Sequence, residues 1–283
     1  MNIPLGTRWQ NNSCAYDAII TILFNIWRDD AILETDTWAE LQCELLDSLT
    51  QGFHKHEDIP VTVASNSVPV RTFTLEQIRD FIRRRLARFS AEFTFGRYAS
   101  VHSATEQLLK MREPVTTSDL YCPNGHDINR HTSSTSNCEI IIFGGGSSLQ
   151  ACMDDFTLET ATRCSICNAY LLRITIFVQA PPLLAFDLGN NAPSLDPMLR
   201  ISCQQPGPGG QDTGTPVSNH CYSLRGVIYF ENNHFTERVI TSSGMVWFHD
   251  GMLTGRSLLY ETNNLTSESI TRDHAVMAFY SRV

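Results

Sequence analysis

Three absences narrow the classes of protein to which this sequence can belong. Positive charge is not in excess, since 21 lysines and arginines face 30 aspartates and glutamates and give a formal net charge of −9 at pH 7. No apolar run reaches the roughly 18 residues that span a bilayer. The opening MNIPLGTRWQ lacks the cationic start and apolar stretch of a secretory signal. We therefore expect an intracellular protein, cytoplasmic or nuclear, that binds neither nucleic acid nor a membrane.

The sequence has enough apolar residues for a large core. It contains 283 residues, of which 42% are hydrophobic, and this suits one domain with subdomains. Helical patterns dominate before Pro114, and short β-type runs dominate after it. Helices followed by a mostly antiparallel sheet predict an α+β fold.

Helices are predicted throughout the first part of the chain. Ser13 can cap a helix from Cys14 to Trp27 that is apolar on all sides, which is typical of a helix inside a sizeable domain. Capping patterns predict three more helices, opening at Thr37–Glu40, Thr74–Gln77 and Ser103–Glu106.

Two details of these helices follow from local signals. Gly52 should end the second helix, because glycine is common just after a helix C-terminus. The third helix carries a group of arginines that we interpret as a solvated face, with a contact surface for an acidic partner as the alternative. These residues are Arg79, Arg83, Arg84, Arg85 and Arg88.

Strands are predicted from short runs of β-branched, aromatic and aliphatic residues. The runs are Glu139–Phe143, Tyr170–Val178, Leu183–Leu188, Tyr222–Phe230, Phe235–Ile240, Met245–His249 and Ala275–Tyr280. The stretch from Cys203 to His220 is rich in proline and glycine, and we expect it to be a long loop without regular structure.

The nine cysteines suggest metal ligands and reduced thiols rather than a disulfide framework. Cys122 and His126 lie in CPNGH, and Cys164 and Cys167 form a CxxC motif. Two such motifs separated by strands are typical of a ribbon in which four ligands hold a structural zinc ion. The alternative is a reduced CxxC with unrelated histidines, and the alternative ligands are His131 and Cys138.

Cys14, His234 and Asp250 have the types and spacing of a nucleophile with its base. His234 begins one predicted strand and Asp250 ends the next, so a hairpin would bring the two side chains together. The N-terminus of a helix and a neighbouring imidazolium both favour the thiolate form of a cysteine. A carboxylate fixes the orientation of the base. Taken alone, Cys14 would be interpreted as a buried structural cysteine.

Stretches of the chain resemble, in order, the motifs of the ubiquitin-specific proteases (USP-type), which are papain-like cysteine peptidases. The family's Gly-Asn-Thr-Cys-Tyr-x-Asn box corresponds to Asn11–Asp17. Its Gly-His-Tyr and Trp-x-x-Phe-Asp boxes correspond to Asn233–Phe235 and Trp247–Asp250. APPLLAFDL and AVMAFYSR are similar to two further strands of the family, so the resemblance covers essentially the whole chain from residue 9.

The resemblance implies a fold with a thumb, fingers and a palm, which we assign to residues 1–115, 116–180 and 181–283. It places the structural zinc in the fingers. It implies a monomeric thiol isopeptidase that removes ubiquitin, or a ubiquitin-like modifier such as SUMO, from lysine conjugates. The implied partners are therefore ubiquitin or SUMO and their conjugates.

The family's motifs assign roles to several residues. Cys14 would attack the carbonyl after a C-terminal Gly-Gly, His234 would move the proton, and Asp250 would orient His234. The family's oxyanion asparagine usually lies five residues before the cysteine, where this chain has Trp9, so Gln10 is the first choice for that role. Three further residues in or beside the matching boxes are candidates for substrate binding: Asn12, Asn233 and Trp247.

The identity of the modifier and the presence of activity are left open by the motifs. Asp17 and the Asn-His-Phe of the histidine box are similar to those of USP-like SUMO isopeptidases, whereas the breadth of the family favours ubiquitin. A catalytically inactive USP-like scaffold is an alternative that the complete Cys-His-Asp set argues against. A zinc-ribbon module for nucleic acid is disfavoured by the charge of −9.

Overall fold

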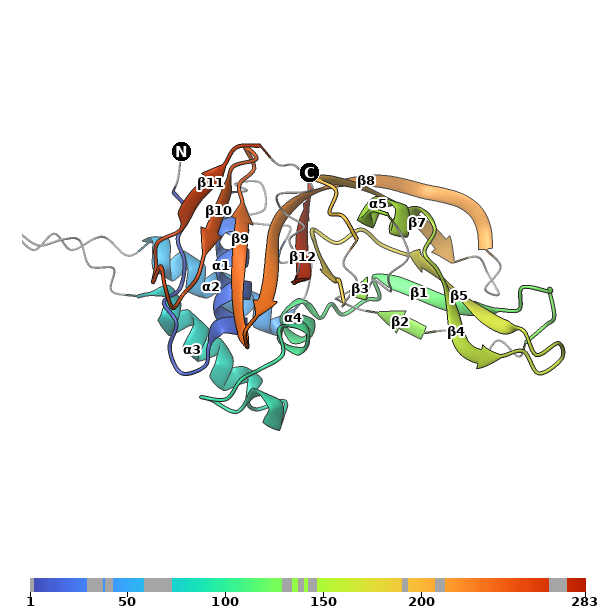
Figure 1. Ribbon diagram of the computed structural model, residues 1–283, viewed down its shortest axis with the longest axis horizontal. Helices are drawn as coiled ribbons and strands as arrows, with labels where there is room; N and C mark the ends of the chain where they lie inside the picture. The colour runs from blue at the N-terminus through green and yellow to red at the C-terminus, as the bar shows by residue number, and fades with distance from the viewer. Residues whose placement is uncertain are drawn as a thin grey trace, which may run out of the picture.

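The computed structural model describes residues 3–29, 38, 43–58, 73–128, 134–136, 140–141, 147–189, 193–206, 212–264 and 274–283. Figure 1 shows an elongated molecule with helices at one end and a β extension at the other. Most of the capping pattern at Thr37–Glu40 lies outside the described residues, as do the alternative metal ligands His131 and Cys138. No described helix is long and apolar enough to cross a membrane.

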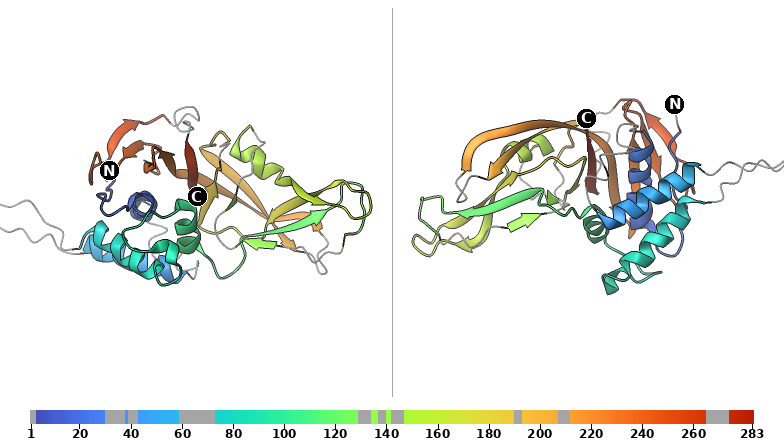
Figure 2. Two further views of the ribbon diagram at one scale, coloured as in Figure 1. Left: turned by 60° about the horizontal axis from the view of Figure 1, so that its bottom comes forward. Right: turned by 180° about the vertical axis from the view of Figure 1, so that it is seen from behind.

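The N-terminal helices gather around the first of them, whereas the last helix packs against the sheet of the β extension. Their bounds are α1 Cys14–Asp29, α2 Glu44–Asp58, α3 Leu75–Leu86, the 3-10 helix η2 Ala91–Phe93, α4 Val101–Leu109 and α5 Leu149–Asp154. Every residue of α1 from Cys14 to Trp27 is buried, which confirms the prediction of an interior helix. In the left view of Figure 2, α1 is seen almost end-on between the other N-terminal helices and the C-terminal strands.

A large mixed sheet forms the rest of the molecule, so the expected sequence of helices followed by strands is observed. Its strands are β1 Thr116–Tyr121, β2 Ser134–Ser136, β3 Ile140–Ile141, β4 Thr157–Arg163, β5 Tyr170–Phe177, β6 Leu183–Asp187, β7 Met198–Pro206, β8 Asp212–Glu231, β9 His234–Ile240, β10 Val246–His249, β11 Leu259–Thr262 and β12 Ala275–Arg282. The main path runs β11-β10-β9-β8-β7-β5-β1-β2, and β12 pairs with β6 and β8. Most pairs are antiparallel, while β3–β6 and β5–β7 are parallel.

The predicted loop between Cys203 and His220 is wrong over most of its length. Strand β7 continues to Pro206, and β8 begins at Asp212 and runs for 20 residues, arching across the top of Figure 1. The register shifts between Cys203 and Gln204 and again before Pro206. Bulges of this kind let a ladder accommodate proline, so a composition unsuited to a regular strand still pairs.

Two glycines allow close packing of elements in the helical end. Contrary to the prediction, Gly52 does not end α2, which continues to Asp58. A Cβ at Gly52 would lie 3.0 Å from a carbon of Ile78, so glycine lets α2 approach α3. A Cβ at Gly226 would lie 2.6 Å from Ile22, so glycine also lets β8 lie against α1.

The predicted starts of the later helices are correct in one case and displaced in the other. The capping box at Thr74 is confirmed, because its side chain accepts the N–H of Gln77 and the Gln77 side chain accepts the N–H of Thr74. Helix α4 begins earlier than expected, with Ser100 as its N-cap in place of Ser103. Both starts belong to helices whose apolar faces join the core around α1.

Candidate active site

Cys14 is the first residue of α1, and a tight loop precedes it. Asn11 and Asn12 both have left-handed backbone conformations, with φ of 54° and 56°. The Ser13 hydroxyl accepts the N–H of Gln10 at 2.9 Å and donates to Asp17 Oδ2 at 2.5 Å. This bonding closes the loop on the first turn of the helix, so Cys14 is held at a fixed helix N-terminus, 4% exposed.

Two arginines of α3 anchor the same loop. Arg79 donates to the carbonyl of Arg8 at 2.7 Å and to Asp17 Oδ1 at 2.8 Å. Arg83 donates to the carbonyl of Asn11 at 2.7 Å. Both arginine side chains are fully buried, so the interpretation of these two as part of a solvated face is wrong. Their spacing with Leu75, Ile78, Ile82 and Leu86 follows the apolar face of the helix, a signal that could have revealed their burial.

His234 follows the shortest kind of hairpin turn. Glu231 at the end of β8 pairs with His234 at the start of β9, leaving only Asn232 and Asn233 between them. Their φ values of 51° and 61° are those of a type I′ turn, in which asparagine is favoured. The imidazole is therefore fixed at the tip of a rigid hairpin that contacts α1.

Asp250 comes directly after β10 and binds the imidazole. Its Oδ1 lies 3.0 Å from His234 Nε2. The same oxygen accepts the N–H of Met252 at 2.8 Å and the N–H of Leu253 at 3.2 Å. The carboxylate thus has a fixed orientation, and the predicted pairing of His234 with Asp250 across a hairpin is observed.

Cys14 also hydrogen-bonds the side chain of His234 and completes the group. The hydrogen bond with the Cys14 sulfur is the largest cause that raises the pKa of His234 to about 9, and Asp250 adds to it while burial opposes it. The imidazole is therefore an imidazolium at neutral pH. This is the charge state in which a cysteine nucleophile is most reactive.

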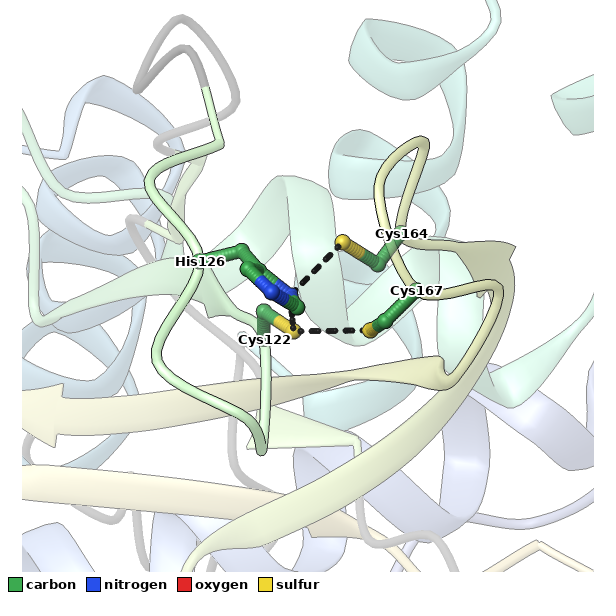
Figure 3. A group of neighbouring side chains, drawn as sticks. All are labelled: Cys122, His126, Cys164 and Cys167. Carbon is green, nitrogen blue, oxygen red and sulfur yellow. Dashed lines mark hydrogen bonds between the residues drawn. The ribbon is translucent and has the colours of Figure 1, made fainter.

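A second cluster lies at the far end of the β extension, between the segment after β1 and the β4–β5 turn. Figure 3 shows its four side chains pointing toward one another. They are Cys122, His126, Cys164 and Cys167, the four ligands predicted from the sequence, and their ligand atoms all lie within 4.8 Å of one another.

The distances in this cluster fit a tetrahedral zinc ion. Cys122 Sγ lies 3.4 Å from both His126 Nδ1 and Cys167 Sγ, and Cys164 Sγ lies 3.8 Å from His126 Nδ1. A zinc ion with ordinary bond lengths separates two sulfurs by about 3.8 Å, and a sulfur from a nitrogen by about 3.6 Å. A backbone N–H of Ala169 and the Asn124 amide lower the pKa of the Cys167 thiol to about 6, which favours the thiolate that a metal requires.

Comparisons with known proteins bear on the fold. No family model matches the sequence, and no curated protein matches it. Solved structures do match. The SAGA DUB module Ubp8/Sgf11/Sus1/Sgf73 bound to monoubiquitin superposes with a TM-score of 0.56 at 11% identity, over 99% of this chain and 69% of that chain. The fold is USP-like.

Other structures of that module agree with this assignment. The Ubp8/Sgf11/Sus1/Sgf73 module bound to ubiquitin aldehyde has a TM-score of 0.55 at 13% identity, over 99% of this chain and 69% of that chain. A yeast SAGA DUB module with an Sgf73 variant has a TM-score of 0.51 at 13% identity, over 99% of this chain and 68% of that chain. Identity this low makes the chain a divergent example of the USP-like fold.

The four other residues predicted for the site have different surroundings. Gln10 is exposed, and it lines a surface hollow of about 420 Å³ with Arg8, Trp9, Glu76 and Arg256. The Asn12 amide donates to the carbonyl of Gly96 at 2.9 Å. Asn233 is an exposed turn residue, and Trp247 packs against Tyr260 with ring centroids 5.4 Å apart. Of these four residues, only Gln10 is both exposed and within a few residues of Cys14 in the sequence.

Sequence motifs did not reveal that the N-terminal segment supports the turn carrying Asp250. The Trp9 N–H donates to the carbonyl of Gly251 at 3.0 Å, and the Gly6 N–H donates to the carbonyl of Arg256 at 3.1 Å. A Cβ at Gly251 would lie 2.9 Å from the Trp9 nitrogen, so glycine is needed for this approach. The segment before the nucleophile and the turn after the carboxylate are thus bonded directly to each other.

Proposed function

We propose that this protein is a thiol-dependent isopeptidase that removes ubiquitin, or a ubiquitin-like modifier such as SUMO, from lysine conjugates. The observation that carries the proposal is the hydrogen-bonded series of Cys14, His234 and Asp250 on a USP-like fold. The matching solved structures are of a DUB module bound to monoubiquitin or ubiquitin aldehyde, which supports ubiquitin as the modifier. The proposal includes a monomeric chain in the cytoplasm or nucleus.

The chemistry requires two proton transfers and one covalent intermediate. The Cys14 thiolate attacks the carbonyl carbon that follows the modifier's Gly-Gly and forms a tetrahedral oxyanion. The imidazolium of His234 gives its proton to the departing lysine amine, leaving a thioester on Cys14. A water molecule then gives a proton to His234 as it attacks the thioester, and the modifier leaves with a free carboxylate. Asp250 keeps the imidazole oriented through both steps.

The oxyanion needs donors close to Cys14. We assign this role to the backbone N–H of Cys14 and the side chain of Gln10, which is exposed beside the nucleophile loop. The Asn12 amide is already engaged with Gly96. Each donor of this kind is worth roughly 3 kcal/mol in comparable sites. Replacing Gln10 with alanine should therefore slow the reaction about a hundredfold.

We assign a structural zinc ion to Cys122, His126, Cys164 and Cys167. The sulfur and nitrogen positions fit the edges of a tetrahedral site, and a site closed by four protein ligands has no position for a substrate. The apolar cluster here is small, with Leu171 packed against the cysteines. The ion would therefore hold the tip of the β extension together, within the region assigned as fingers at residues 116–180.

Reactive probes made from ubiquitin and from SUMO, each with an electrophile at its C-terminus, test the proposal. We expect the wild-type chain to form a covalent adduct with at least one probe and Cys14→Ala to form none while still binding the modifier. Cys221→Ala is the matched control, because this cysteine is exposed and lies away from the triad. A folded wild-type chain that binds the modifiers but reacts with neither probe would contradict the proposal and favour the inactive scaffold.

The relative rates with the two probes decide which modifier is the substrate. The matching structures favour ubiquitin, whereas Asp17 and the Asn-His-Phe motif favour SUMO. A rate difference of more than about tenfold, equivalent to 1.4 kcal/mol in the transition state, assigns the substrate. Labelling of Cys14 by both probes at similar rates would assign a protein that acts on more than one modifier.

A further inference from the structure

A second acid–imidazole pair lies beside the triad and has no role in the chemistry above. Glu237 on β9 and His249 on β10 are directly opposite each other in the strand register. His249 Nδ1 lies 2.5 Å from Glu237 Oε1, and the two side chains are 0% and 2% exposed. His234 is the first residue of β9, and Asp250 directly follows β10. These two strands therefore carry two acid–imidazole pairs close together.

Both ring nitrogens of His249 face acceptors. Nδ1 faces the Glu237 carboxylate, and Nε2 lies 2.8 Å from the carbonyl oxygen of Gly255. An imidazole satisfies two acceptors only when both nitrogens carry protons. Burial is the largest cause and opposes the charged ring, but Glu237, the carbonyl of Gly255 and the charge of Asp17 on α1 together outweigh it and raise the pKa of His249 to about 9. His249 is therefore a buried imidazolium.

The bonds of His249 lead directly to the catalytic carboxylate. His249 precedes Asp250 in the chain, and Gly255 closes the turn that contains Asp250. Within that turn the Thr254 N–H donates to the carbonyl of Asp250 at 2.8 Å. The N–H groups of Met252 and Leu253 donate to the Asp250 carboxylate. A Cβ at Gly6 would lie 2.3 Å from His249 Nε2, so the backbone packs against the ring and prevents it from moving.

We propose that His249, kept charged by Glu237, is a positioning residue that fixes the turn from Asp250 to Gly255 and so orients Asp250 toward His234. This inference rests on the proposed catalytic role of Asp250. A buried ion pair is seldom the most stable filling for such a space, because an apolar pair often serves equally well. What an apolar pair lacks is a directed N–H bond to Gly255, and this bond is the function that we assign to His249.

A double substitution separates positioning from stability. Glu237→Leu with His249→Phe removes both buried charges and retains apolar side chains of similar size. We expect kcat on a fluorogenic amide of the modifier to fall about 10- to 100-fold with KM within about twofold, as for other small misplacements of catalytic groups. Glu261→Gln is the matched control, because it removes the ion pair between Arg238 on β9 and Glu261 on β11 without touching the turn. It should retain the wild-type kcat.

A second variant and a readout independent of activity complete the test. Glu237→Gln replaces one carboxylate oxygen with an amide nitrogen and so lets His249 lose its charge. We expect kcat to fall. We also expect the proton resonance at His234 Nε2 to shift, because this resonance reports the hydrogen bond to Asp250. A wild-type kcat and an unchanged resonance in either folded variant would overturn the inference. If the wild-type chain proves inactive, the proposed function fails, while the resonance still tests whether His249 positions Asp250.

Discussion

The guanidinium of Arg79 donates to the carboxylate of Asp17 at 2.8 Å, and both side chains are buried. Asp17 lies in the first turn of α1 and Arg79 in α3, so this ion pair joins the nucleophile's helix to its neighbour. Arg79 also donates to Ser13 Oγ at 3.2 Å, which brings the residue before Cys14 into the same network. The position of Cys14 thus depends on the packing of α3.

Replacing Arg79 should destabilise the fold strongly. Arg79→Leu leaves the Asp17 carboxylate buried without its partner, and breaking a buried pair in this way costs about 3–5 kcal/mol. Arg84→Leu is the matched control, because Arg84 lies on the exposed side of the same helix and should cost less than about 1 kcal/mol. Chemical denaturation of the two variants measures the difference. Equal costs would show that the ion pair does not hold α1 and α3 together.

The raised pKa of His234 predicts how the stability of the fold changes with pH. Its folded pKa of about 9 exceeds the ordinary value of 6.5, because the Cys14 sulfur and Asp250 favour the imidazolium. The stability that this provides is fully present below pH 6.5 and is lost as the pH rises through 9. Following the His234 ring proton by NMR against pH should give this pKa directly.

Asp250→Asn should lower both the pKa of His234 and the rate. The neutral amide removes the carboxylate's charge and leaves the imidazole free to adopt the wrong tautomer. We expect the pKa to move toward 6.5 and kcat to fall at least a hundredfold, since general acid–base catalysis is worth that much. The ring protons of His102, which binds Asp187 at 2.9 Å elsewhere in the fold, serve as an internal control. An unchanged His234 titration would remove Asp250 from the mechanism.

Metal analysis should find about one zinc ion per chain. Cys164→Ser should lose the ion and lower the melting temperature, because the apolar cluster at this tip is too small to hold it alone. Cys221→Ser is the control, since Cys221 lies outside the cluster, and should keep both the ion and the melting temperature. A chelator should reproduce the effect of Cys164→Ser in the wild-type chain. Full zinc content in Cys164→Ser would contradict the assigned ligand set.

Gly226→Ala should strain the contact between β8 and α1. The added methyl would lie 2.6 Å from the Ile22 side chain, which is itself enclosed in the core, and overpacking of this kind costs about 1–3 kcal/mol. Ile22→Ala in the same chain removes the three side-chain carbons that the added methyl would meet and should recover part of the loss, although alone it is destabilising. A double variant no more stable than Gly226→Ala would contradict the steric cause. Thermal unfolding of the three variants makes the comparison.

Prediction from the sequence succeeded where a pattern is local or where chemistry limits the choice of residue. The apolar residues of α1 can only belong to an interior helix, and the four Cys and His residues predicted as ligands do come within 4.8 Å of one another. The pairing of His234 with Asp250 followed from two strands joined by a short turn, which fixes the register.

Prediction failed where a distant partner decides the outcome. Arg79 and Arg83 have the composition of a solvated surface, but backbone carbonyls and a carboxylate from the nucleophile loop satisfy their charges in the interior. Gly52 has the composition of a helix end, yet its small size serves the packing of α2 against Ile78. Pairing across bulges likewise placed the described parts of the proline-rich stretch before His220, outside residues 207–211, in strands.

The backbone bonds between the N-terminal segment and the turn after Asp250 have a consequence for biogenesis. Synthesis delivers Cys14 early, whereas the partners of Trp9 and Gly6, Gly251 and Arg256, emerge from the ribosome much later. Until they do, the N-terminal segment before Cys14 lacks the turn to which it is bonded in the folded protein. A premature stop anywhere before residue 250 therefore yields a product that lacks Asp250 and the turn bonded to the N-terminal segment, so the proposed activity requires synthesis of nearly the whole chain.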